Sequence, residues 1–128
     1  MPKKVIIVDD SKTVVATAEM ALEDSVSAGL ITFKGYLSPV ELLADLQNGV
    51  IDFDLLISDI NMPQMNGLEL TSHIKADVRF KTKPILILTT ESSAEMKQKG
   101  KELGVTGWMV KPFSDDKLLK SVKMVLGI

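Results

Sequence analysis

The sequence predicts an α/β fold in which a five-stranded parallel sheet has helices on both faces. Five short apolar runs recur along the 128 residues at nearly even spacing. Each run is continuous rather than alternating, which is typical of strands buried on both sides of a parallel sheet. The segments between the runs are long enough for crossover helices. We therefore expect a strand–helix unit that is repeated five times.

The predicted strands are the apolar runs Val5 to Val8, Leu30 to Phe33, Leu55 to Ile57, Ile85 to Leu88 and Trp108 to Val110. Apolar residues between the runs fall at helical spacing, as in Val15, Ala18 and Leu22.

Start and stop signals bound the predicted helices. Serines stand where N-caps are expected, at Ser11, Ser38, Ser92 and Ser114, and Pro39 follows Ser38 at a favourable first helical position. The stop signals are Gly29, Gly49 and Gly104. The residues after Lys111 suffice for one last helix. We expect residues 1–128 to form a single domain.

Composition excludes several classes of function. The chain is 45% hydrophobic and 25% charged, as an ordinary water-soluble globular domain is. Its net charge of −2 disfavours nucleic acid and anionic lipid as partners. The absence of cysteine excludes disulfides and thiolate zinc sites, and the single histidine, His73, cannot build a multi-histidine site. A bound metal would therefore have oxygen ligands.

The N-terminus lacks the pattern of an export signal. After Met1-Pro2-Lys3-Lys4 only four apolar residues precede Asp9, which is too short for a signal peptide or a membrane span. We expect a cytoplasmic protein with no membrane partner.

Polar side chains gather where the predicted strands end. Asp9 and Asp10 follow the first run, Asp59 closely follows the third, Thr89 follows the fourth and Lys111 follows the fifth. In an open α/β sheet, ligands bind beyond the carboxyl ends of the strands, so these five side chains should converge.

The chemistry of this group of residues favours phosphoryl transfer. Clustered carboxylates repel one another unless a cation compensates them, and Mg²⁺ is the natural oxygen-bound cation. An aspartate can attack phosphorus to give an acyl phosphate while a lysine neutralises the phosphoryl oxygens. Asp59 is the candidate nucleophile, because the loop from Ile60 to Gly67 contains a proline and a glycine that can hold a turn.

Four motifs together resemble one family. They are the acidic pair in Val8-Asp9-Asp10-Ser11, the loop from Asp59 to Gly67, Leu88-Thr89-Thr90-Glu91 and Lys111-Pro112-Phe113. The chain resembles the receiver domains of two-component response regulators, and among them the stand-alone chemotaxis regulators of the CheY type. That resemblance implies a flavodoxin-like fold, of which CheY is a standard example, with strand order 2-1-3-4-5.

The resemblance also implies the roles of the acidic residues. Asp59 would accept a phosphoryl group from a phosphohistidine on a sensor histidine kinase of the CheA type. Asp10 and Asp59 would bind Mg²⁺ directly, Asn61 would bind it through its backbone carbonyl, and Asp9 would bind it through water. The protein would thus be a signalling phosphoacceptor rather than an enzyme.

Three further residues complete the site that the resemblance implies. Lys111 would pair with Asp59 or its phosphate, through a turn with a cis Lys111-Pro112 bond. Thr89 would bond the phosphoryl oxygen and act with Trp108 as a coupled switch. The switch would alter a face made by the fourth helix, the fifth strand and the fifth helix.

That face would dock a separate protein, because we expect no output domain. The expected partners are the kinase, a flagellar motor switch protein or other target, and a phosphatase, and the chain is expected to be a monomer. Asn61 and Glu91 flank the approach to Asp59 and should tune the lifetime of the phosphate.

Other functions were weighed against this one. A phosphatase of the haloacid-dehalogenase type needs Asp-x-Asp, but Asn61 is the second residue after Asp59 and its amide cannot do acid–base work. In a flavodoxin-like electron carrier, Asp9 and Asp10 would repel the flavin phosphate. A stand-alone receiver in a phosphorelay other than chemotaxis, and a pseudo-receiver that only binds partners, remain alternatives.

Overall fold

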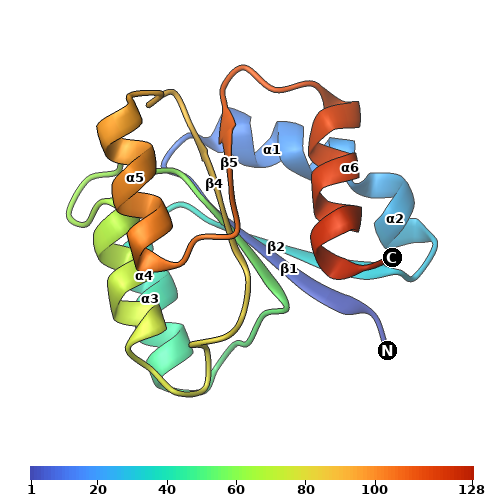
Figure 1. Cartoon of the computed structure of the whole chain (residues 1–128). Coiled ribbons are helices and arrows are strands. Elements are labelled where there is room, and N and C mark those ends of the chain that lie inside the picture. The colour runs from blue at the N-terminus through green and yellow to red at the C-terminus, as the bar shows by residue number, and fades with distance from the viewer.

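One central sheet organises the whole chain (Figure 1). The computed structural model describes residues 1–128. The strands are β1 (Lys3–Val8), β2 (Ile31–Tyr36), β3 (Leu55–Ser58), β4 (Ile85–Thr89) and β5 (Gly107–Val110). The helices are α1 (Lys12–Ala21), α2 (Glu23–Ser27), α3 (Pro39–Gln47), α4 (Gly67–Lys75), α5 (Ala94–Leu103) and α6 (Asp115–Leu126). The strands pair in parallel in the order β2-β1-β3-β4-β5, which confirms the predicted fold class and strand order.

Two apolar cores lie on the two faces of the sheet. Successive side chains of a strand point to opposite faces, so Ile6 and Val8 of β1 pack with α3 and α4, while Val5 and Ile7 pack with α1 and α6. Helix α5 lies beside α4, on the same face (Figure 1). All four residues of β3 are buried. Burial on both faces explains why the strands read as continuous apolar runs.

The chain contains one helix more than expected, because the first predicted helix is divided at Leu22. The backbone of Leu22 leaves helical geometry at φ −102° and ψ 3° while its side chain stays fully buried in the core. Helix α2 then begins with Glu23 and Asp24, whose carboxylates suit the positive end of a helix. The fourth and fifth predicted helices are therefore α5 and α6.

Side-chain caps begin most of the helices as predicted. The hydroxyl groups of Ser11, Ser38 and Ser114 accept hydrogen bonds from the backbone N–H three residues on, at 3.3, 3.2 and 3.1 Å. The prediction of Ser92 as a cap is wrong. Ser93 caps α5 instead, because only a residue directly before Ala94 can reach the N–H of Met96.

Helix α4 begins with a capping box that the sequence analysis did not identify. The Asn66 side chain accepts from the N–H of Glu69, and the Glu69 carboxylate accepts from the N–H of Asn66. The predicted stop signals are confirmed, since Gly29, Gly49 and Gly104 have positive φ just after a helix. None of the helices has the length and apolar character that crossing a bilayer requires.

Candidate functional site

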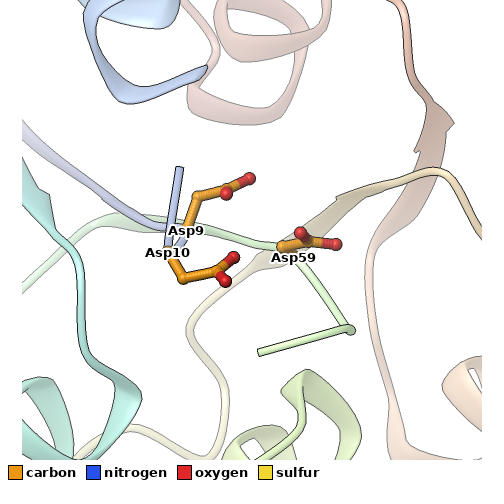
Figure 2. A group of neighbouring side chains, drawn as sticks. All are labelled: Asp9, Asp10 and Asp59. Carbon is orange, nitrogen blue, oxygen red and sulfur yellow. The ribbon is translucent and has the colours of Figure 1, made fainter. Parts of the chain in front are cut away.

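Three carboxylates meet at the carboxyl ends of β1 and β3, which are neighbours in the sheet (Figure 2). Asp9 and Asp10 follow β1 and Asp59 follows β3. One carboxylate oxygen from each of the three lies within 4.8 Å of the other two. Asp9 and Asp59 are buried, with 1% and 7% of their surface exposed, whereas Asp10 is exposed. The cluster is therefore partly sheltered and open on the side of Asp10.

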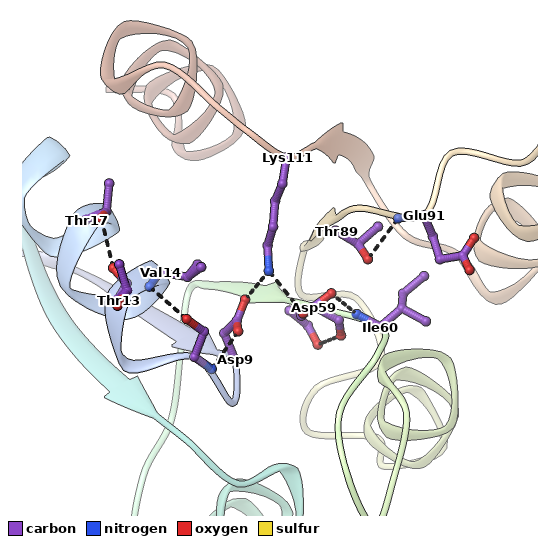
Figure 3. A network of polar contacts seen from close by, with 11 residues as sticks. Asp9, Thr13, Val14, Thr17, Asp59, Ile60, Thr89, Glu91 and Lys111 are labelled. Atoms are coloured by element: carbon purple, nitrogen blue, oxygen red, sulfur yellow. Dashed lines mark hydrogen bonds and ion pairs between the residues drawn. The ribbon is translucent and has the colours of Figure 1, made fainter.

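The ammonium group of Lys111 bridges two of these carboxylates (Figure 3). Its Nζ lies 2.6 Å from Oδ2 of Asp9 and 3.0 Å from Oδ2 of Asp59. Lys111 follows β5, and its peptide bond to Pro112 is cis, as the resemblance implied. The site thus joins residues that are 102 and 52 positions apart in the sequence.

The charges in the site do not balance. Burial raises the pKa of the Asp9 carboxyl, and the hydrogen bond from Lys111 offsets this only in part. Burial alone would lower the pKa of Lys111, but the hydrogen bonds to Asp9 and Asp59 outweigh it and raise that pKa. Lys111 therefore stays protonated at neutral pH, and its single positive charge faces three acidic side chains.

Backbone N–H groups fix the orientation of the two buried carboxylates. Oδ1 of Asp59 accepts from the N–H of Ile60 at 2.7 Å, and Oδ1 of Asp9 accepts from the N–H of Ser11 at 2.9 Å. The main-chain carbonyl of Asp59 accepts from the hydroxyl of Ser58 at 2.8 Å. Asp59 is thus held through both its side chain and its backbone.

The donor set fits a hard divalent cation. A carboxylate oxygen has more than one lone-pair site, so Asp9 and Asp59 can bind a cation while they keep their hydrogen bonds. Asp10 faces solvent and supplies a third carboxylate. Asn61 lies exposed in the loop after Asp59. This acidic cluster could therefore hold a metal ion.

The loop after Asp59 closes by close backbone packing. A Cβ on Gly67 would overlap the carbonyl oxygen of Asp59, and the N–H of Gly67 donates to the carbonyl of Ile60 at 2.9 Å. The positive φ in this loop, 72°, belongs to Gln64. The glycine is therefore required for close approach, and not for the turn conformation that the sequence analysis assigned to it.

Thr89 and Trp108 are linked through the backbone of one residue, Glu91. The buried hydroxyl of Thr89 accepts from the N–H of Glu91 at 3.3 Å (Figure 3), and the indole N–H of Trp108 donates to the carbonyl of Glu91 at 2.9 Å. No hydrogen bond joins Thr89 to Asp59. Sequence reasoning placed Glu91 beside the site but missed this link, because a backbone contact leaves no signature in the side-chain pattern.

The geometry agrees with a comparison of the sequence against family models. The model described as the response regulator receiver domain matches residues 5–123. The chain belongs to this family. Receiver domains are signalling proteins, and the relatives of this receiver place it among those of the CheY type.

Three known proteins illustrate the similarity. The receiver is 42% identical over 76 residues to chemotaxis protein CheY1 of Helicobacter pylori (strain J99), which covers 59% of this chain and 61% of that protein. It is 34% identical over 111 residues to chemotaxis protein CheY-3 of Vibrio cholerae, which covers 87% of this chain and 82% of that protein. A solved structure of Vibrio cholerae chemotaxis protein CheY4 superimposes with a TM-score of 0.87 at 41% identity, covering 98% of this chain and 100% of the other.

Proposed function

We propose that this receiver is a cytoplasmic, monomeric phosphoacceptor of a chemotaxis two-component system, phosphorylated on Asp59 in the presence of Mg²⁺. The observation that supports this most directly is the bridge from Lys111 to Asp9 and Asp59 beside the exposed Asp10. A carboxylate that accepts phosphate needs nearby cations. Lys111 supplies one positive charge, and the three acidic side chains attract a second cation.

The chemistry at Asp59 is a transfer between two nucleophiles. A carboxylate oxygen of Asp59 attacks phosphorus, the new O–P bond forms, and the N–P bond of a phosphohistidine on a CheA-type kinase breaks. The electron pair of the broken bond stays on the imidazole nitrogen of the kinase, which takes up a proton. The N–H of Ile60 holds one oxygen of Asp59 in place, so that the carboxylate is aimed before the donor arrives.

Charge compensation at the phosphoryl group comes from two sources. The ammonium group of Lys111 lies 3.0 Å from the carboxylate of Asp59 and would pair with the phosphoryl oxygens once Asp59 is phosphorylated. Mg²⁺ would neutralise the remaining charge when it is held by Asp10, Asp59 and the carbonyl of Asn61, with Asp9 bound through water.

The signal would leave the site through Thr89. When its hydroxyl turns to a phosphoryl oxygen, the N–H of Glu91 loses its acceptor and the loop after β4 is free to move. The carbonyl of Glu91 accepts from the indole of Trp108, so the position of the ring changes together with that of the loop. The switch would thus change the face made by α5, β5 and α6, which we propose as the docking surface for a flagellar motor switch protein. A phosphatase would end the signal.

The experiment is to expose the protein to a small acyl-phosphate donor with and without Mg²⁺, and to follow intact mass and Trp108 emission. We expect the wild type to gain one labile phosphoryl group only with Mg²⁺, together with a change in emission. Asp59→Asn should gain none. The matched control is Asp54→Asn, because Asp54 lies at the opposite end of β3.

Two results would contradict the proposal. Phosphorylation that survives in Asp59→Asn would place the acceptor elsewhere. A wild type that responds neither to the donor, nor to a CheA-type kinase, nor to beryllofluoride would instead be a pseudo-receiver that only binds partners. Docking of the phosphorylated form to a motor switch peptide then separates chemotaxis from another phosphorelay.

A further inference from the structure

The indole of Trp108 lies against a glycine in the last part of α5. A Cβ built on Gly100 would stand 2.9 Å from Cζ3 and 3.3 Å from Cε3 of Trp108, and 3.2 Å from Cγ2 of Val105. Gly100 is buried, and Trp108 is half-buried and packs against the apolar core on the face of the sheet that α3 and α4 cover. The six-membered ring of the indole therefore fills the space that a side chain at position 100 would take.

A glycine inside a helix needs an explanation. It lowers helix stability relative to alanine, since the unfolded chain loses more conformational freedom at glycine. Gly100 has no positive φ that would require it. The closest atom that a Cβ at this position would meet belongs to Trp108, so the contact with the indole is the one that alanine disturbs most.

We propose that Gly100 is a positioning residue, whose missing side chain creates the niche in which Trp108 rests and so sets the balance between inward and outward positions of the indole. In the inward position the ring lies under α5 and its N–H bonds Glu91. A side chain at position 100 pushes the ring outward and breaks that bond. The effect of the ring position on signalling rests on the proposed function, whereas the position of the Trp108 ring against Gly100 does not.

The effect on the phosphoryl group follows from linkage. The bond to Trp108 holds Glu91, whose N–H binds Thr89, so the positions of the ring and of the Thr89 hydroxyl are not independent. We assign the inward ring to the phosphorylated state, so a variant that disfavours the inward ring should bind a phosphoryl mimic more weakly.

The test compares Gly100→Ala with a matched substitution, Gly107→Ala. At both positions a Cβ would come within 2.9 Å of a side-chain atom, but at Gly107 that atom is Cδ1 of Leu86 and not the indole. Acrylamide quenching of Trp108, the only tryptophan, reports the exposure of the ring without Mg²⁺ or donor. We expect the quenching constant to rise about twofold in Gly100→Ala, as a half-buried ring becomes exposed, and to stay near wild type in Gly107→Ala. Unchanged quenching in Gly100→Ala, or an equal rise in both variants, overturns the proposal.

A second measurement covers the case in which Gly100→Ala folds poorly. In a Trp108→Phe background the six-membered ring of the indole is gone. Gly100→Ala should then no longer lower the urea midpoint, and the higher helix propensity of alanine should raise it. If Gly100→Ala lowers the urea midpoint equally with Trp108 and with Phe at position 108, the proposal is overturned.

Beryllofluoride with Mg²⁺ separates this proposal from the function on which it rests. Weaker binding by Gly100→Ala than by wild type and Gly107→Ala supports the proposal. If the wild type does not respond, the proposed function fails while the placement of the ring is still decided by quenching. If all three proteins respond equally, the phosphoacceptor stands and the role of Gly100 in signalling is refuted.

Discussion

The Cα of Gly67 packs against the main-chain carbonyl of Asp59 so closely that any side chain would overlap that oxygen. The atom that a Cβ at position 67 would overlap belongs to the backbone and not to the end of a flexible side chain, so the loop itself would have to move to accommodate the Cβ. We expect Gly67→Ala to lower the free energy of unfolding by about 3 kcal/mol, as overpacking in a rigid core does. Urea denaturation measures this loss.

The same variant should also lose phosphorylation, because the shift moves the backbone that aims Asp59. Gly107→Ala is the control, since its neighbour Cδ1 of Leu86 can rotate away and the cost should stay below about 1 kcal/mol. Equal stability of Gly67→Ala and wild type would show that the loop is not packed as described.

Mg²⁺ should stabilise the folded protein through Asp10. A ligand that binds only the folded state at about 100 times its dissociation constant adds about 2.7 kcal/mol. Thermal unfolding with Mg²⁺ and with EDTA measures the difference, which should shrink strongly in Asp10→Asn and persist in Asp24→Asn, an exposed aspartate of α2. Equal Mg²⁺ stabilisation of all three proteins would refute Asp10 as a ligand.

Two adjacent threonines give a sharp test of the switch. Thr89 is fully buried and bonds Glu91, whereas Thr90 is exposed. We expect Thr89→Ala to keep the Mg²⁺-dependent mass gain and to lose most of the change in Trp108 emission. Thr90→Ala should keep both. An unaltered emission change in Thr89→Ala would mean that the signal does not pass through its hydroxyl.

Tyr36 predicts a stability change at alkaline pH. Burial, together with the hydrogen bond to Asp45, raises the pKa of its phenol to about 12 from 10.0. Below pH 10 the phenol is neutral in both states, so its contribution is fully present. Between about 10 and 12 the unfolded chain ionises first, and stability falls by about 2 kcal/mol as pH rises.

Tyr36→Phe has no phenol to ionise and is the control for that loss. Urea titrations of both proteins at pH 8 and pH 11 remove the shared contribution of lysines by subtraction. A difference between the two proteins that does not change with pH would contradict the raised pKa.

The sequence was most informative where both faces of a strand are buried. The runs that became β1, β3 and β4 were located to within two residues, because double burial leaves a continuous apolar pattern. The edge strand β2 was placed less well, since it extends to Tyr36 through Lys34 and Gly35. Backbone pairing with β1 maintains the strand there, and exposed edge residues carry no apolar signal.

The convergence of Asp9, Asp59 and Lys111 could be predicted because the topology of a parallel sheet brings strand ends together. Features that depend on backbone geometry could not be predicted from the sequence. Nothing in the residue types distinguishes Ser92 from Ser93 as a cap, and Leu22 carries no glycine or proline signal for the break after α1.

The strand order divides the molecule by how readily its amide hydrogens exchange with solvent. Asp9, Asp10 and Asp59 follow β1 and β3, which have strands on both sides and helices on both faces, so the amides of these two strands should exchange only when the whole protein unfolds. Trp108 stands on β5, a four-residue strand with one neighbour, whose amides can exchange through local opening. Under the proposed function, the chemistry lies beside the slowest-exchanging strands and the signal leaves through a faster one, so the proposed docking face can rearrange while the carboxylates keep their geometry.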